Sequence, residues 1–214
     1  MEILSHRGYW REASEKNTVA AFERSFALGY GTETDVRDVA GQLVISHDPP
    51  RGGELTLDQL LILAGAGQPT LAINIKADGL AVPIAETMLH HGYSNWFAFD
   101  MSIPDTRAQL AAANPTFIRM SEVEAAPPFL HAVNGVWLDA FETDGWRINA
   151  LERLLELGLR VCLVSPELHR RPHQPFWQQL KESGLHRRDK VMLCTDVPEE
   201  ASAFFADADQ GAAA

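Results

Sequence analysis

Residues 18–37 read Thr18-Val-Ala-Ala-Phe-Glu-Arg-Ser-Phe-Ala-Leu-Gly-Tyr-Gly-Thr-Glu-Thr-Asp-Val-Arg37 and contain one complete helix–strand unit. The first part predicts a helix over residues 18–29, because threonine is a favoured N-cap residue and Gly29 stands where helices commonly end. The second part predicts a strand over residues 31–37. A helix that leads directly into a strand is the repeating unit of proteins with a parallel sheet.

The same unit recurs along the chain. Short apolar or alternating runs predict eight strands, over residues 2–6, 31–37, 71–76, 96–100, 116–121, 134–139, 159–165 and 190–196. The clearest helices between them are predicted over residues 18–29, 56–64, 82–91, 103–113, 146–157 and 174–183. The segment 124–128 ends in two prolines, so we expect that crossover to lack a long helix. Repeated strand–helix units predict an α/β fold, a single-domain (β/α)₈ TIM barrel.

Residues 38–48 depart from this pattern. A turn at Gly41 and the run Leu43-Val-Ile-Ser-His47 predict a short extra strand that pairs with the second barrel strand. A doubly wound open sheet is the competing architecture, but the first strand is not followed by the glycine-rich phosphate loop typical of such folds. We expect the barrel to occupy residues 1–206, with no large insertion, and residues 207–214 to form a disordered tail.

The chain has 214 residues and a formal net charge of −11, from 18 basic and 29 acidic side chains. A field of this sign disfavours nucleic acids and anionic membranes as partners. No segment reaches the roughly 20 apolar residues that a membrane span needs, and the N-terminus lacks the features of a secretory signal. We therefore expect a cytoplasmic protein with a small-molecule partner, no nucleic acid and no stable membrane association. The oligomeric state stays open.

Four polar residues are predicted to point into the barrel. Glu33 and Asp35 are two positions apart on one strand, so their side chains share a face. Asn74 and Lys76 repeat this spacing on the next strand. Two converging carboxylates are costly to bury unless a cation lies between them, and oxygen ligands favour Mg²⁺ or Ca²⁺. A hydrogen-bonded core pair without a metal is the alternative.

Two histidines are predicted at strand ends on the same side of the barrel. His6 ends the first strand and His47 ends the extra strand. Histidine can donate and accept protons near neutral pH, so the pair could supply a base and an acid for cleavage of a phosphodiester. Arg7 could bind the phosphate oxygens, and Gly8 lets the backbone turn close to a ligand.

Other residues predicted near this end of the barrel could contact substrate. Asp100 and Asp139 close two strands, where TIM barrels place function, although each could instead cap the following helix. Trp10 could line the mouth or pack on the first helix. The loop 166–173 gathers four potentially basic side chains that could attract an anionic substrate, with a solvated loop as the alternative. Asp196 is expected to tie the last strand to the next loop.

At these residues the chain resembles the glycerophosphodiester phosphodiesterase family of metal-dependent (β/α)₈ barrels, and the resemblance covers nearly the whole length. The matching motifs are His6-Arg7-Gly8, Asn17-Thr18-Val-Ala-Ala21-Phe22, Glu33-Thr-Asp35-Val36, Val44-Ile-Ser-His47-Asp48 and Thr195-Asp196-Val-Pro198. They occur in the family's order.

The resemblance implies a role for each matching residue. His6 and His47 would be the acid–base pair. Glu33, Asp35 and Asn74 would bind the metal, Mg²⁺ or Ca²⁺, and Arg7 and Lys76 would contact the phosphate of a glycerophosphodiester-like substrate.

The chain departs from the family pattern at three places. Asn74 replaces the family's third acidic ligand and lowers the ligand charge by one, and Lys16 replaces a glutamate. Only residues 49–55 follow the His-Asp motif before the next helix, where family members commonly carry an inserted segment, so we expect a more open mouth.

Two alternatives follow from these departures and from the fold. One is a non-catalytic phosphoester-binding barrel, in which Asn74 marks a weakened metal site. The other is a phospholipase-D-like lipid phosphodiesterase, for which the sequence offers no apolar surface segment.

Overall fold

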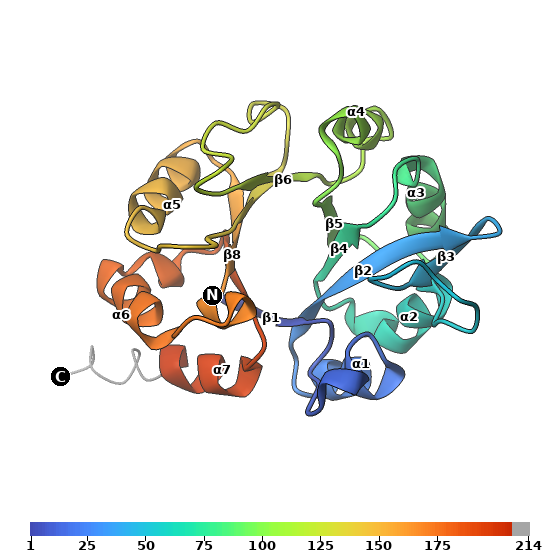
Figure 1. Ribbon diagram of the computed structural model, residues 1–214, viewed down its shortest axis with the longest axis horizontal. Coiled ribbons are helices and arrows are strands. Elements are labelled where there is room, and N and C mark those ends of the chain that lie inside the picture. The colour runs from blue at the N-terminus through green and yellow to red at the C-terminus, as the bar shows by residue number, and fades with distance from the viewer. Residues whose placement is uncertain (207–214) are drawn as a thin grey trace.

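The computed structural model describes residues 1–206, and the prediction made for the tail 207–214 lies outside them. Eight parallel strands form the inner wall of a barrel, and helices surround them (Figure 1). The strands are β1 (Glu2–His6), β2 (Gly31–Val39), β4 (Leu71–Ile75), β5 (Trp96–Phe99), β6 (Phe117–Met120), β7 (Gly135–Leu138), β8 (Arg160–Val164) and β9 (Val191–Thr195). The predicted TIM barrel is confirmed.

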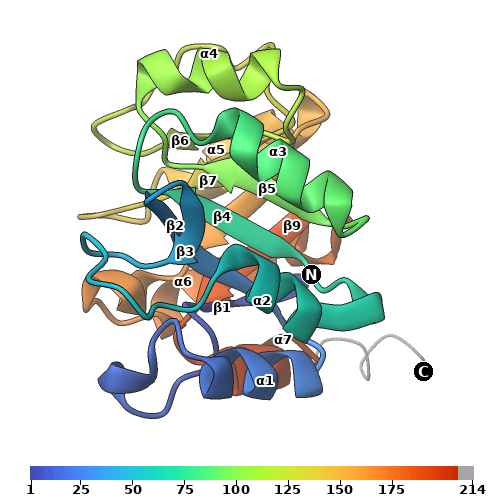
Figure 2. The ribbon, with the colours of Figure 1, turned by 90° about the vertical axis from the view of Figure 1, so that its right-hand side faces the viewer.

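The extra strand is also confirmed. β3 (Gln42–Ile45) pairs antiparallel with the end of β2, with Val36 opposite Ile45. The two strands form a hairpin that extends from one side of the barrel (Figures 1 and 2). The loop after β3 lines one cavity together with Arg7, the residue that follows β1.

The strand order around the barrel is β5-β4-β2-β1-β9-β8-β7-β6. Every neighbouring pair in this order forms a parallel ladder, but the two end strands, β5 and β6, meet only at one bridge. At that bridge Ala98 lies opposite Thr116, and the Ala98 N–H donates to the carbonyl of Pro115 at 2.8 Å. The barrel is therefore nearly closed, with a weak seam between β5 and β6.

Seven α-helices cover the strands within the described residues. They are α1 (Val19–Ala27), α2 (Leu57–Ala64), α3 (Ala81–His90), α4 (Ile103–Ala111), α5 (Arg147–Glu156), α6 (Gln174–Ser183) and α7 (Pro198–Ala206). The crossover from β6 to β7 contains no helix, as its prolines predict. α7 was not among the clearest helices predicted from the sequence, although Pro198 and its acidic first turn are helix-start signals.

Apolar side chains fill both sides of the strands. Inside the barrel, Phe97 stacks on Phe117 across the seam with ring centroids 3.8 Å apart, and Phe99 stacks on Trp137 at 3.9 Å. Outside it, one core joins β2–β5 to α1–α3, and a second joins β1 and β6–β9 to α5–α7. This interior packing leaves the polar residues of β1, β2 and β4 at one end of the barrel.

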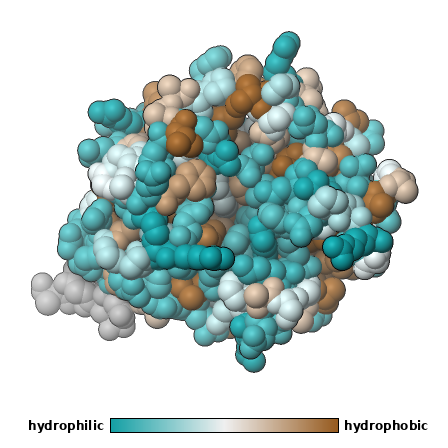
Figure 3. Space-filling model, in the orientation of Figure 1, coloured by the Kyte–Doolittle hydropathy of each residue, from teal (hydrophilic) through white to brown (hydrophobic). Residues whose placement is uncertain are grey.

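The face seen in Figure 3 is mainly hydrophilic, and its hydrophobic residues are scattered. Across residues 1–206, no helix combines the length and apolar character needed to cross a membrane.

Candidate functional site

The predicted site residues of β1, β2 and β4 meet at the carboxyl end of the barrel, called here the mouth. His6 lies opposite Glu33 in the β1–β2 ladder, and Asp35 lies opposite Asn74 in the β2–β4 ladder. Their side chains point inward because alternate residues of a strand share a face. Glu33, Asp35 and Asn74 are named the acidic cluster below.

Glu33 is almost completely buried, and its carboxylate lies beside Asn74 and His6. Its Oε1 accepts a 3.1 Å hydrogen bond from Nδ2 of Asn74, and its Oε2 lies 3.8 Å from Nε2 of His6. Burial, followed by the nearby charge of Asp35, raises the pKa of Glu33 to about 7. Near neutral pH, a cation at this position would favour the ionised form.

Asp35 is fully buried and held by cationic and amide groups. Nε of Arg7 lies 2.9 Å from its Oδ2, and Nδ2 of Asn17 donates to the same oxygen at 2.9 Å. Nζ of Lys76 lies 3.6 Å from Oδ1. Arg7 and Asn17 both adopt left-handed backbone conformations, and the Asn17 N–H donates to the Arg7 carbonyl. Sequence reasoning did not assign Asn17 this contact with Asp35.

Gly8 allows the turn that places Arg7. Its φ is +79°, and a Cβ at this position would lie 2.7 Å from the Ala21 Cβ. Only glycine fits such a backbone pressed against α1. The phosphate-binding candidate Arg7 thus depends on its neighbour for its position.

The acidic cluster has unused oxygen atoms. Glu33 Oε2, Asp35 Oδ1 and Asn74 Oδ1 are buried and accept no hydrogen bond from any described residue. Buried acceptors normally have partners, and carboxylate and amide oxygens suit Mg²⁺ or Ca²⁺. Within residues 1–206, no three His, Cys, Asp or Glu side chains are grouped as a metal site, so an ion here would need Asn74. The donor set fits a hard cation held by two carboxylates and one amide.

His6 is oriented by a residue from the far end of the chain. Its Nδ1 lies 2.8 Å from Oδ1 of Asp196, which directly follows β9. Donation of the Nδ1 proton to Asp196 leaves Nε2 facing Glu33 and the mouth. The Asp196 N–H donates to Oε1 of Glu167, which lies in the loop after β8 and not in the loop after β9 that the sequence suggested. The contact with His6 was not predicted either.

His47 lies at the edge of the mouth, on the loop after β3. Its side chain is 49% exposed and its Nδ1 lies 2.9 Å from Oδ1 of Asp48. It lines a cavity of about 980 Å³ together with Arg7 and Asn17. The residue before it is fixed to the acidic cluster, because the Ser46 N–H donates to the Asp35 carbonyl at 3.0 Å. His47 therefore faces the same region as Arg7 from outside the barrel.

A chain of charges continues around the mouth from Asp35. Lys76 lies 3.3 Å from Oδ2 of Asp100, and Arg119 of β6 lies 2.7 Å from Oδ1 of Asp100. Asp100 does not cap α4, because the Ser102 hydroxyl accepts the hydrogen bond at that helix start. These contacts link the acidic cluster to the strands on the other side of the seam.

Trp10 lies beside His6 at the rim. Its Nε1 donates to the His6 carbonyl at 3.1 Å, and the Lys16 ammonium lies 4.4 Å from its ring centroid. It lines a cavity of about 470 Å³ that also includes Tyr9 and Asp196. The same cavity is bounded by Glu199 and Glu200 at the start of α7, and a substrate contact by Trp10 stays a prediction.

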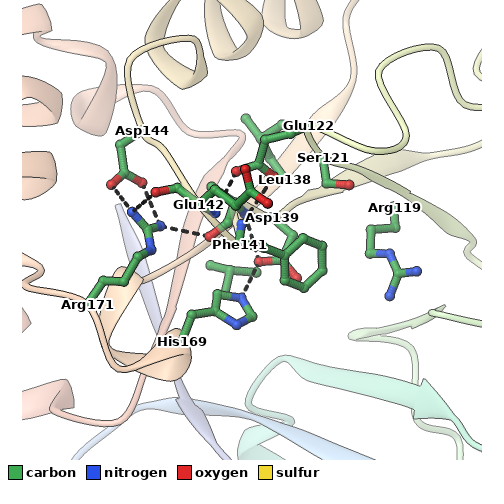
Figure 4. Close-up of polar contacts among 12 residues, drawn as sticks. Arg119, Ser121, Glu122, Leu138, Asp139, Phe141, Glu142, Asp144, His169 and Arg171 are labelled. Atoms are coloured by element: carbon green, nitrogen blue, oxygen red, sulfur yellow. Dashed lines mark hydrogen bonds and ion pairs between the residues drawn. The ribbon is translucent and has the colours of Figure 1, made fainter.

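A second polar cluster occupies the β7–β8 side of the mouth (Figure 4). Asp139, which follows β7, accepts a 2.7 Å hydrogen bond from Nε2 of His169. Arg171 pairs with Asp144 at 2.6 Å. These two basic residues of the loop 166–173 are therefore paired and not simply solvated, and no sequence signal identified their partners.

No protein-family model matches this sequence, and no curated protein matches it. Among solved structures, it is similar to a glycerophosphodiester phosphodiesterase from Agrobacterium tumefaciens, with 20% identity, a TM-score of 0.68 and coverage of 99% of this chain and 100% of that one. It is also similar to an Oleispira antarctica phosphodiesterase in complex with the product sn-glycerol-3-phosphate, with 14% identity, a TM-score of 0.70 and coverage of 96% and 97%.

A third similar structure is a tryptophan synthase from M. tuberculosis, with 12% identity, a TM-score of 0.56 and coverage of 97% of this chain and 89% of that one. Different enzymes thus share this architecture, and activity has to be argued from the site. The chain therefore has the (β/α)₈ barrel fold that glycerophosphodiester phosphodiesterases share with other enzymes.

Proposed function

We propose that the protein is a phosphoric diester hydrolase that cleaves a small glycerophosphodiester-like substrate to an alcohol and a phosphomonoester, with Mg²⁺ or Ca²⁺ as cofactor. The observation that carries the proposal is the set of three buried oxygens of Glu33, Asp35 and Asn74 at the mouth that accept no hydrogen bond from any described residue. Two solved barrels with similar folds are phosphodiesterases, which supports the same reaction class.

The chain's own residues account for binding of the phosphate. Arg7 and Lys76 carry positive charge at the rim of the acidic cluster, and each retains donor groups beyond its contact with Asp35. Asn17 and Asp35 hold the arginine in place. When bound, the cation would neutralise phosphate charge and stabilise the charge that develops during cleavage.

Proton transfer is assigned to the two histidines. His6, with Nδ1 directed to Asp196, presents Nε2 toward the mouth and can take a proton from the attacking hydroxyl or give one to the departing alcohol. His47 supplies the complementary group from the loop beside the cavity of about 980 Å³. Because His47 is half exposed at the edge of the mouth, either the substrate has to extend to it or its loop has to move toward the bound phosphate.

The test is hydrolysis of a panel of glycerophosphodiesters with Mg²⁺, with Ca²⁺ and with EDTA. His6→Ala and His47→Ala should each lower the rate by about 10² or more. His91→Ala is a matched control, because it removes a histidine that pairs with Asp58 at 2.8 Å in the helical layer. Activity that survives chelation would contradict the metal role, and activity that survives loss of His6 would contradict the acid–base assignment.

One observation favours a second candidate, a non-catalytic phosphoester-binding barrel. The third ligand is the neutral Asn74, whose Nδ2 donates to Glu33. If the natural protein hydrolyses no substrate of the panel while Asn74→Glu does, the binding-protein interpretation is correct.

A further inference from the structure

We infer that His169 and Asp139 form a hydroxyl-binding subsite that positions the glycerol part of the substrate on the β7–β8 side of the mouth. This inference rests on the proposed function and adds a specificity-determining residue to it. Its starting point is a histidine–carboxylate pair that phosphate binding and proton transfer do not use (Figure 4).

The carboxylate of the pair is built into the barrel. Asp139 is 6% exposed, and its Oδ1 accepts hydrogen bonds from the Ala140 N–H at 2.8 Å and from Nε2 of His169 at 2.7 Å. Its own N–H donates to the carbonyl of Met120. The backbone therefore fixes the direction in which Asp139 holds the imidazole.

His169 uses only one of its two ring nitrogens, Nε2, in the hydrogen bond to Asp139. Donation of the Nε2 proton to Asp139 leaves Nδ1 with a lone pair, and Nδ1 has no hydrogen-bond partner within residues 1–206. The side chain is 24% exposed, and the Phe141 ring lies 4.8 Å from it. An oriented acceptor beside an aromatic wall suits an alcohol hydroxyl with a short carbon chain, because the hydroxyl donates while the carbons pack on the ring.

The surrounding loops are rigid enough to support such a subsite. Glu122 accepts hydrogen bonds from the backbone N–H groups of residues 141–143, and Arg171 pairs with Asp144 and donates to the Ala140 carbonyl (Figure 4). These contacts hold the turn that carries Phe141. Precise positioning of this kind is what discrimination between alcohols requires.

The ion pairs that Asp100 makes with Lys76 and Arg119 connect the subsite to the phosphate region. Arg119 lies 5.9 Å from the Phe141 ring centroid and pairs with Asp100, which pairs with Lys76. Asp139 and His169 follow β7 and β8, so they share the mouth with His6 and the acidic cluster. A substrate whose phosphate lies at Lys76 can therefore extend its glycerol toward His169.

The experiment combines a change in the protein with a change in the substrate. Wild type and His169→Ala are assayed with sn-glycero-3-phosphocholine and with two analogues, one lacking the C1 hydroxyl and one lacking the C2 hydroxyl. For the natural substrate we expect KM to rise about tenfold in His169→Ala, with a smaller change in kcat. For the analogue that lacks the recognised hydroxyl, the two proteins should have nearly equal KM.

Two further variants distinguish hydroxyl recognition by His169 from a packing role of His169 in its loop. His173→Ala, in which the lost imidazole pairs with Glu200 at 2.9 Å, should leave the ratio of KM values between substrate and analogues unchanged. His169→Gln retains an acceptor and should recover part of the discrimination. Equal losses for all three substrates in His169→Ala would show a structural role and overturn the inference.

Binding of sn-glycerol 3-phosphate, measured by calorimetry, tests the subsite without turnover. Weaker binding to His169→Ala, with unchanged binding of a phosphate that lacks the hydroxyls, supports the inference. Unchanged binding of both overturns it. If no phosphodiester is hydrolysed by wild type, the proposed reaction fails, and this binding measurement still decides the role of His169.

Discussion

Asn74→Asp is the substitution that most directly tests the acidic cluster. Asn74 is 8% exposed and donates its Nδ2 hydrogen to the buried Glu33 at 3.1 Å. The aspartate removes this donor and adds a negative charge beside Glu33 and Asp35. Loss of a hydrogen bond to a charged group costs roughly 1.5–3 kcal/mol, so in EDTA we expect the free energy of unfolding to fall by about 3 kcal/mol.

A bound cation should reverse much of this loss. An ion that binds only the folded protein stabilises it by about 2.7 kcal/mol at a concentration 100 times its Kd. The variant has one more ligand charge than wild type and should bind Mg²⁺ or Ca²⁺ more tightly. Its stability should therefore increase more than that of wild type when the cation replaces EDTA.

Urea unfolding of both proteins, with EDTA or with each cation at constant ionic strength, measures the difference. Asn114→Asp is the matched control, because Asn114 is 5% exposed and donates to the carbonyl of Ala81 and the side-chain oxygen of Gln109. It should be destabilised equally in all buffers. The reasoning is refuted if cations shift neither wild type nor Asn74→Asp, since the cluster would then bind no metal.

Three other substitutions test separate features. Asp196→Asn removes the carboxylate that orients His6 and should lower the rate of hydrolysis about 10- to 100-fold without changing the melting temperature, as checked by calorimetry and kinetics. Gly8→Ala has to accommodate a φ of +79° and a 2.7 Å approach to Ala21, so thermal unfolding should show a loss of at least about 2 kcal/mol. For Glu122, burial favours the protonated form, but backbone N–H donors from the turn after β7 outweigh it and lower the pKa from 4.5 to about 2. The ionised Glu122 carboxylate therefore stabilises the fold above pH 4.5, and its contribution is lost as the pH falls toward 2. In urea unfolding, Glu122→Gln should be about 1 kcal/mol less stable than wild type at pH 7 and equal to it near pH 2.

The barrel could be predicted from the sequence because its strands are buried on both faces. Such strands appear as short continuous apolar runs, and seven of the eight predicted ranges contain the strand that the structure has. The exception is β2, which continues two residues past the predicted range 31–37, to Val39, where it pairs with β3. The prolines at 127–128 marked the missing helix between β6 and β7. The omission of α7 has a different cause, since its apolar residues repeat weakly and only its first turn carries a clear signal.

The site could be predicted only where the alternation of side chains along a strand determines which residues point into the barrel. Alternation placed Glu33 and Asp35 on one face, and Asn74 contacts Glu33 as a result. The partner of His6 lies 190 residues away along the chain, at Asp196. Nothing local to either residue marks such a contact, because the fold creates it by placing β9 beside β1.

The seam between β5 and β6 determines where this barrel should open most easily. A single backbone bridge joins the two strands, and the outer cores on either side of it are separate. Local fluctuations have low free energy where few hydrogen bonds must break. We expect amide protons along the facing edges of β5 and β6 to exchange with solvent sooner than those between β8 and β9. Because the Phe97–Phe117 stack and the Asp100–Arg119 ion pair also span the seam, side-chain contacts and not a backbone ladder hold the acidic-cluster side of the mouth to the side that carries His169.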